Sequence, residues 1–355
     1  MVVPARAQSG EQDELRRTDD TIDRFRAGVL ACCARHLGEP VVELSQPGGP
    51  SRCSWRAHFA SATVIVTRRE DPRRSELEFQ VLSRLAASAA PAVPRVIAFD
   101  GTWLIQEDLG DARLTDCLAR GDAEQTETGL DQAIASLCRI HDTARQTGLG
   151  RDVAVLGVRP AWLEGLAREP AQLSQSLDIP APGLDLATLA ECLAPQRIDF
   201  IKWDARPGNA NLRDGHVAWY DWEHCGARDP IDDLVWLLAD EFVPYDPALE
   251  ARLLARCLSE IAPDRSADAA TEYLSVFGCF HMVKRLQRIV DAKGDGPWQD
   301  AGICVGQDKA GITSFHVTNL CHRGTDWAAR HPLTRPMAPW FEALHDYSER
   351  HWLPQ

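Results

Sequence analysis

Hydrophobic and polar positions along this chain follow two different periods. Short runs rich in β-branched and aromatic residues, bounded by turn residues, predict strands. Such runs occupy 41–44, 55–60, 63–66, 103–105 and 217–220. Apolar residues that recur every three or four positions predict amphipathic helices instead. These patterns cover 74–87, 128–147, 249–261, 267–292 and 338–352.

The strands of the first third form a recognisable local unit. A turn cluster at 46–51 precedes the runs at 55–60 and 63–66, so the sequence predicts a β-hairpin that follows a glycine-containing loop. Later segments are mostly helical by periodicity, with breaks at Gly294, Gly296, Pro297 and Pro332. The chain therefore begins with strands and ends with helices.

The stretch from Ile198 to Leu234 holds the clearest candidate chemistry. Asp204 and Asn209 flank the tight Pro207-Gly208 turn, and Asp221 follows a predicted strand. Transfer of a γ-phosphoryl group requires one carboxylate for the acceptor hydroxyl and hard oxygen ligands for Mg²⁺. These three side chains can supply those groups, with Asp204 as base and Asn209 and Asp221 as metal ligands. Taken alone, the same pattern also fits an ordinary turn.

Three motifs in this stretch resemble the aminoglycoside phosphotransferase-like kinases, a family related to choline kinases and protein kinases. The family patterns H-x-D-x-H-x-x-N, I-D-W-E and G-D-P-x-x-D-L correspond to segments 202–209, 220–223 and 228–234. The resemblance implies an α+β, protein-kinase-like bilobal fold with a small antiparallel β-sheet and a mostly helical second lobe. The expected boundaries are 1–108, including a helix at about 20–37, and 109–355.

The resemblance also implies where a nucleotide would bind. Gly48, Gly49 and Ser51 are candidates for a loop over the phosphates, although an incomplete glycine motif fits a plain hairpin turn equally well. The segment from Trp103 to Gly110 resembles the family hinge whose backbone pairs with adenine, which makes Glu107 and Leu109 further candidates.

A phosphate-binding lysine is the main feature that the family has and this chain lacks. The family pairs a strand lysine with a helix glutamate, for which Glu78 is the match. Thr67 follows the strand at 63–66, however, and the first lysine of the whole chain is Lys202. We expect Arg68 to replace the lysine, with Arg69 and Arg56 as alternatives, because arginine also binds phosphate well.

The catalytic loop itself departs from the family at two cations. Lys202 stands where the family has a loop-bracing His or Arg, and Arg206 stands where it often has His. Lys202 could brace the loop, favour ionised Asp204 or reach a phosphate oxygen. Arg206 could face the phosphoryl group or the acceptor. We expect structural roles for His141, which lies on a helix before the loop, and for Asp233, which opens the helix after it.

Composition narrows the partners. The 355 residues are 45% hydrophobic and 25% charged, which is typical of a soluble globular chain. The polar N-terminus lacks a signal peptide pattern, and no run is long enough to span a membrane, so we expect a cytoplasmic protein. A net charge of -14 argues against nucleic acid and favours a cationic acceptor. The eleven cysteines show no zinc or disulfide spacing.

The favoured function is an ATP- or GTP- and Mg²⁺-dependent transfer to a hydroxyl of a small molecule such as an antibiotic or a biosynthetic intermediate. A kinase for Ser or Thr of a peptide and a pseudokinase binding module are the alternatives. By the resemblance, the late helices and the insertion after the hinge build the acceptor pocket, although the aromatic residues of the late helices also fit a packed core. These residues are Trp298, Phe315, His316, Trp327, Trp340 and Phe341, with acidic Asp240, Glu241 and Asp246 nearby.

Overall fold

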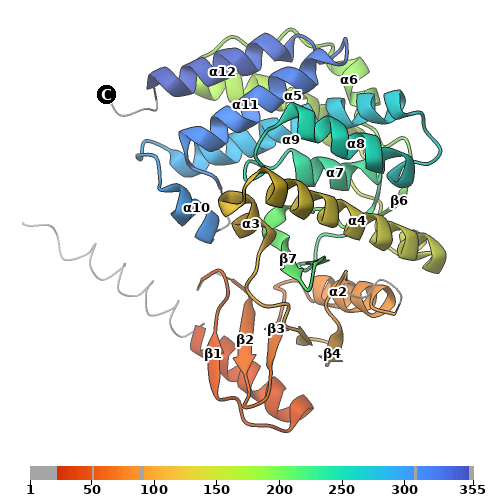
Figure 1. Cartoon of the computed structure of the whole chain (residues 1–355), viewed down its shortest axis with the longest axis vertical. Coiled ribbons are helices and arrows are strands. Elements are labelled where there is room, and N and C mark those ends of the chain that lie inside the picture. The colour runs from red at the N-terminus through yellow and green to blue at the C-terminus, as the bar shows by residue number, and fades with distance from the viewer. Residues whose placement is uncertain (1–21, 50–51, 88–91, 308–309, 352–355) are drawn as a thin grey trace, which may run out of the picture. The chain divides into compact units, whose positions relative to one another are not determined.

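The computed structural model describes residues 22–49, 52–87, 92–307 and 310–351. The chain divides into two compact units (Figure 1). One unit extends to Phe79 and includes Val96–Asp108; the other takes Gln80–Arg95 and the chain from Leu109 onward. Antiparallel strands fill the first unit and helices dominate the second, as predicted for the fold class.

A five-stranded antiparallel sheet forms the first unit, in the order β1-β2-β3-β5-β4. Its strands are β1 (Glu43–Ser45), β2 (Ser54–His58), β3 (Thr63–Thr67), β4 (Val96–Phe99) and β5 (Leu104–Glu107). Alternate residues of β2 and β3 are buried, so the period of two in the sequence marks the face that packs. The predicted hairpin is thereby confirmed, with Trp55 opposite Val66.

Helical residues 22–37 cover this sheet with an apolar face. Val29, Cys32 and Cys33 of the helix are buried together with Trp55 and Trp103 of the sheet. The adjacent cysteines therefore contribute to the core, as their place in an apolar run predicts. Helix α2 (Pro72–Leu85) follows β3 and carries the predicted buried positions Val81, Leu82 and Leu85.

Long helices and short strand pairs make up the second unit. The helices are α3 (Leu114–Arg120), α4 (Ala123–Thr147), α5 (Pro160–Leu177), α6 (Leu186–Cys192), α7 (Ile231–Leu238), α8 (Pro247–Ile261), α9 (Ala267–Lys293), α10 (Ala301–Gln307), α11 (Ser314–Ala329) and α12 (Met337–His351). The antiparallel pairs join β6 (Asp199–Ile201) to β9 (Gly226–Arg228), and β7 (Ala210–Arg213) to β8 (His216–Trp219). Among the described helices, none is both long and apolar enough to cross a membrane.

Helix α9 is the centre of this unit. It packs against α5, α7, α8 and α11 (Figure 1), and residues on every side of its middle turns are buried. The glycine in its interior permits one of these close approaches, because a Cβ atom at Gly278 would lie only 2.2 Å from the ring of Trp327. Such burial on all sides identifies α9 as a core helix rather than a surface helix.

Candidate active site

Unusual backbone conformations occur where the candidate catalytic residues lie. Trp203, Asp204 and Asp221 have positive φ angles of 51°, 56° and 62°. Non-glycine residues rarely adopt this conformation, and a bulky tryptophan does so only when its surroundings enforce it. The loop after β6 and Asp221, two residues after the end of β8, are therefore held in strained geometry by specific contacts.

Asp233, in the first turn of α7, supplies much of that restraint. Its carboxylate accepts hydrogen bonds from the backbone N–H groups of Lys202 and Trp203, each at 2.8 Å. The Nε2 atom of His141 on α4 lies 2.9 Å from the same carboxylate, and both side chains are buried. The predicted structural roles of Asp233 and His141 are confirmed, since they brace the loop from a helix on each side.

Lys202 lies beneath the loop and is fully buried. Its ammonium group donates to the backbone carbonyls of Asp204 and Asp221, at 3.3 and 3.2 Å. Burial lowers the pKa of Lys202, while the negative charges of Asp204 and Asp221 oppose that shift. One ammonium thus ties together the backbones of the two residues that carry the candidate carboxylates.

The side chains of Asp204 and Asn209 contact each other directly. The Asn209 amide donates to the Asp204 carboxylate at 2.8 Å and to its backbone carbonyl at 3.0 Å. Asp204 and Asp221 are both half-buried, so their carboxylates combine fixed positions with access to solvent. The structure therefore brings together the Asp204 and Asn209 side chains and holds Asp221 beside them through Lys202.

Arg206 is buried and belongs to a charged network next to the loop. Its Nε atom donates to Asp240 at 2.7 Å, and Asp240 lies 3.7 Å from Arg285 of α9. Arg285 in turn forms a bidentate pair with Glu241. Burial alone would raise the pKa of Glu241, yet Arg285 holds it well below its usual range. Two of the three acidic residues expected at an acceptor pocket, Asp240 and Glu241, are thus paired with arginines, whereas the third, Asp246, is exposed and caps α8.

In the first unit, Glu78 forms its ion pair with Arg69 rather than with Arg68. The Arg69 guanidinium donates from Nε and Nη2 to the two carboxylate oxygens, at 2.9 and 3.0 Å. Glu78 is fully buried, and Arg69 is 9% exposed. Arg68 instead lies over the Trp103 ring, 5.7 Å from its centroid, and Arg56 pairs with Asp108.

The remaining nucleotide candidates lie in ordinary structural positions. Gly48 and Gly49 have φ angles of 80° and 94° in a turn closed by backbone hydrogen bonds, while Ser51 lies outside the described residues. Glu107 ends β5 opposite Val64, and Leu109 is buried just after it. These contacts explain the local fold and leave the predicted nucleotide contacts as predictions.

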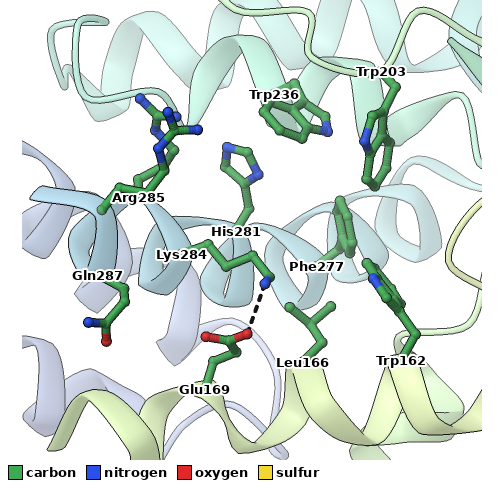
Figure 2. A pocket seen from close by; sticks show the side chains of 11 residues that line it. Trp162, Leu166, Glu169, Trp203, Trp236, Phe277, His281, Lys284, Arg285 and Gln287 are labelled. Carbon is green, nitrogen blue, oxygen red and sulfur yellow. Dashed lines mark hydrogen bonds and ion pairs between the residues drawn. The ribbon is translucent and has the colours of Figure 1, made fainter. Parts of the chain in front are cut away.

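A cavity of about 330 Å³ opens beside Trp203 in the second unit (Figure 2). It is lined by Trp162, Leu166, Glu169, Trp203, Trp236, Phe277, His281, Lys284, Arg285, Gln287 and Arg288. None of the six aromatic residues expected from the late helices is among these described lining residues. Trp327, Trp340 and Phe341 are core residues instead. The signal that could have found the cavity is the helical spacing of Phe277, His281 and Arg288 on one face of α9.

A separate group of possible metal ligands lies in the first unit. Ligand atoms of Cys32, His36 and Asp100 all lie within 4.8 Å of one another. Burial raises the pKa of Cys32 to about 12, with a further contribution from Asp100. The thiol is thus protonated at neutral pH in the metal-free protein. Asp100 also pairs with Arg35 at 3.0 Å, which gives this group a structural explanation.

The chain is similar to known phosphotransferases in sequence and in fold. The model of the phosphotransferase enzyme family, APH, matches residues 52–268. A macrolide 2'-phosphotransferase from Brachybacterium faecium superposes with a TM-score of 0.53 at 17% identity, covering 76% of this chain and 94% of that one. Spectinomycin phosphotransferase in complex with ADP and spectinomycin gives a TM-score of 0.50 at 11% identity, covering 92% and 94%. No curated protein sequence matches the chain significantly.

Proposed function

Since the chain belongs to the phosphotransferase enzyme family, we propose that it transfers the γ-phosphoryl group of ATP or GTP to a hydroxyl group of a small molecule. The observation that carries this proposal is the strained loop in which Asn209 bonds Asp204 and Lys202 ties Asp204 to Asp221. A bulky residue such as Trp203 adopts a positive φ only where the surrounding contacts enforce it, and residues of this kind concentrate at functional sites.

Asp204 is the proposed catalytic residue. Its half-buried carboxylate would accept the proton of the acceptor hydroxyl or orient that hydroxyl for attack. The hydrogen bond from Asn209 fixes the position of the carboxylate. Positioning of this kind supplies most of the catalysis in phosphoryl transfer, because the protein forms no covalent intermediate.

Asn209 and Asp221 are the proposed metal ligands. Both offer oxygen donors, and Mg²⁺ prefers such donors from one or two carboxylates together with phosphate oxygens. The donor set of the loop fits that preference. A bound Mg²⁺ would neutralise the negative charge that develops on the phosphates during transfer.

The Arg69–Glu78 pair is the proposed equivalent of the family's lysine–glutamate pair. The bidentate pair holds the guanidinium in one orientation, and a planar guanidinium is a good phosphate ligand. This buried pair supports a working enzyme over the pseudokinase alternative. Whether the acceptor is a peptide is tested below by including peptides among the acceptors.

For Lys202 we propose a positioning role rather than phosphate contact. Its ammonium is enclosed and bonded to two carbonyls, so it orients the backbone of Asp204 and Asp221. Arg206, bonded to Asp240, is proposed to hold the loop's second half. A role of Arg206 toward the phosphoryl group or the acceptor stays a prediction.

The test measures Mg²⁺-dependent binding and turnover of ATP and GTP by the purified protein, with hydroxylated small molecules, peptides and water as acceptors. Asp204→Asn should retain nucleotide binding and lose at least about a hundredfold in turnover. Asp221→Asn should lose the Mg²⁺ dependence of binding. Asp214→Asn is the matched control, because Asp214 also has a positive φ but lies in the exposed β7–β8 turn.

If neither nucleotide binds in millimolar Mg²⁺, the proposal is wrong. Turnover by Asp204→Asn equal to that of Asp214→Asn would remove Asp204 from the mechanism.

A further inference from the structure

The cavity beside Trp203 has an aromatic end. Trp203 contacts both Trp236 and Phe277, with ring centroids 5.3 and 6.3 Å apart. Figure 2 shows Trp203, Phe277 and Trp162 on one side of the cavity. Flat apolar walls of this kind accommodate a planar ring or another apolar body.

A buried cation lies behind these aromatic rings. The Arg228 guanidinium lies 5.0 Å from the ring centroids of Trp162 and Phe277, and 5.9 Å from that of Trp203. Arg228 is fully buried and paired with Asp232 at 2.5 Å. The electron-rich ring faces already interact with this guanidinium, so a second cation on the cavity side would gain less from them. The aromatic end is therefore poorly suited to an ammonium group.

The opposite end of the cavity is positively charged. Lys284, Arg285 and Arg288 line it from α9, whereas Glu169 of α5 is its acidic residue. Glu169 is paired with Lys284 at 2.8 Å, and Arg285 is paired with Glu241. Within the described ranges, Arg288 has no hydrogen bond or ion pair. An exposed arginine at the edge of this cavity is thus available to an anion.

The electrostatic surroundings of this end agree with that charge. Partial burial lowers the pKa of Arg288, and the positive charges of Arg285 and Arg206 lower it further, whereas Glu241 and Asp204 oppose the shift. Burial likewise lowers the pKa of His281 well below its usual value, again with help from Arg285. His281 is therefore neutral at pH 7.

Buried polar atoms in the cavity wall lack protein partners. The Nη1 atom of Arg285, the Nε2 atom of His281 and the Nε1 atom of Trp236 have no hydrogen-bond partner in the part of the chain that the structure describes. Arg285 and His281 are only 2% and 5% exposed. Figure 2 shows the His281 imidazole between Arg285 and Trp236. Nη1 of Arg285 and Nε1 of Trp236 are donors, whereas Nε2 of the neutral His281 donates or accepts according to its tautomer. Buried donors without partners are costly, so this arrangement fits a ligand that carries hydrogen-bond acceptors.

We propose that this cavity binds the phosphoryl acceptor and that the acceptor is a planar, apolar molecule with a carboxylate-like anionic group. The aromatic end holds the ring, and Arg288, with Arg285 behind it, binds the anion. The inference rests on the proposed function, since it places the acceptor against Trp203, the residue that precedes Asp204 in the loop. It also reverses the expectation from the whole-chain charge of -14, which favoured a cationic acceptor.

The test uses three probes with one benzene ring and one primary alcohol: 3-(hydroxymethyl)benzoate, 3-(hydroxymethyl)benzamide and 3-(hydroxymethyl)benzylamine. Ligand-observed NMR titrations without nucleotide or Mg²⁺ measure their dissociation constants. The benzoate should bind about tenfold more tightly than the benzylamine, with the benzamide between them, because charge-assisted hydrogen bonds form only with the anion.

Arg288→Gln should weaken benzoate binding about tenfold and benzamide binding less than about twofold. Arg335→Gln is the matched control and should change neither constant, because Arg335 is exposed and lies outside the lining residues. Circular dichroism of both variants reports whether they fold.

Equal or tighter binding of the benzylamine overturns the proposal, and so does benzoate binding that Arg288→Gln leaves unchanged. Failure of all three probes to bind at about 10 mM, where millimolar constants are measurable, also overturns it. Nucleotide binding is measured in separate samples. If the protein prefers the benzoate but binds no nucleotide, only the proposed phosphoryl transfer is contradicted. If it binds nucleotide but does not prefer the benzoate, only the proposed acceptor class is contradicted.

Discussion

The catalytic loop of the second unit and the Arg69–Glu78 pair of the first unit solve different physical problems. In the loop, the positions of Asp204 and Asp221 depend on positive φ angles that the Asp233 carboxylate and the Lys202 ammonium maintain. In the Arg69–Glu78 pair, the guanidinium only has to come within hydrogen-bond distance of the carboxylate. The first requirement ties each residue to a fixed place in the chain, whereas the second allows a longer side chain to act from a different place.

The substitution in the first unit illustrates that freedom. Thr67, where the sequence pattern places the family lysine, is buried and its hydroxyl bonds Ser54. Arg69 follows the end of β3 and spans the remaining distance to Glu78. Its backbone N–H also donates to Ser75 in α2, which fixes the arginine's starting point. A charge partner for Glu78 can thus come from a different position in the chain, whereas a residue that needs a particular backbone conformation is more constrained.

Removal of the guanidinium should produce the largest effect. Arg69→Met leaves Glu78 buried without its charge partner, so the free energy of unfolding should fall by about 3–5 kcal/mol. Arg68→Met is the matched control on the next residue and should cost less than about 1 kcal/mol. Urea denaturation measures both values. Equal losses for the two variants would mean that the buried pair has no special role.

Breaking the loop brace should have a smaller effect on stability. Asp233→Asn keeps the shape of the side chain but replaces one carboxylate oxygen with an NH2 group. That group cannot accept, so the buried hydrogen bond from the backbone N–H of Lys202 or Trp203 is lost. We expect about 2 kcal/mol less stability by urea denaturation, together with reduced nucleotide turnover. Asp116→Asn, on partly exposed Asp116 of α3, should leave both unchanged. A stable variant with normal turnover would contradict the bracing role.

Lys202→Met should separate stability from turnover. Methionine fills a similar volume, and loss of a buried charge offsets the loss of its two hydrogen bonds, so the free energy of unfolding should change by less than about 1 kcal/mol. Turnover should fall at least about tenfold because Asp204 and Asp221 lose their common anchor. Nucleotide affinity should stay within about twofold. A large loss of affinity would instead support direct phosphate contact by Lys202.

The smallest predicted effect is a pH dependence of stability that is due to His281. It tests whether the cavity is more positively charged than the loop. Arg285 and Lys284 of α9, Arg206 of the loop and Glu241 after α7 act on this imidazole. Because its pKa is lowered in the folded protein, the unfolded chain binds a proton first as the pH falls below about 6.5. Stability is therefore present above that pH and decreases toward pH 5.5.

The loss attributable to His281 should approach about 1.4 kcal/mol per pH unit in this window. His281→Gln should show a shallower pH dependence in urea denaturation, whereas His216→Gln, at an exposed position, should follow the parent protein. Parallel curves for both variants and the parent would show that His281 is not held neutral.

Local sequence patterns predicted several elements well. The hairpin of β2 and β3 and the helices α2, α4, α8, α9 and α12 were predicted within a few residues, because apolar periodicity directly reflects which face is buried. Asn209 bonds Asp204, and Lys202 bonds the backbone carbonyls of Asp204 and Asp221, so these residues are connected in the structure while their roles stay predictions. Proximity along the chain made this connection predictable.

Contacts between distant segments were not predictable in the same way. The sequence favoured Arg68 over Arg69 as the partner of Glu78, although both were considered, because alternation along a strand does not extend to the residues after its end. Trp162, Trp203, Trp236 and Phe277 come from four separate segments, so their meeting depends on how α5, α7 and α9 pack. The contact of Arg228 with these rings could not be predicted for the same reason.

The sequence by itself determined the element types, the identity of the loop carboxylates and the absence of an early lysine, since each is a property of neighbouring residues. Only the tertiary structure decided which arginine meets Glu78, what holds Asp204 in its strained conformation and what charge the cavity carries. The physical reason is that burial and pairing redistribute charge: Asp240 and Glu241 are neutralised by arginines, and Arg288 remains at the edge of an aromatic cavity. An acidic chain thereby builds a locally positive site.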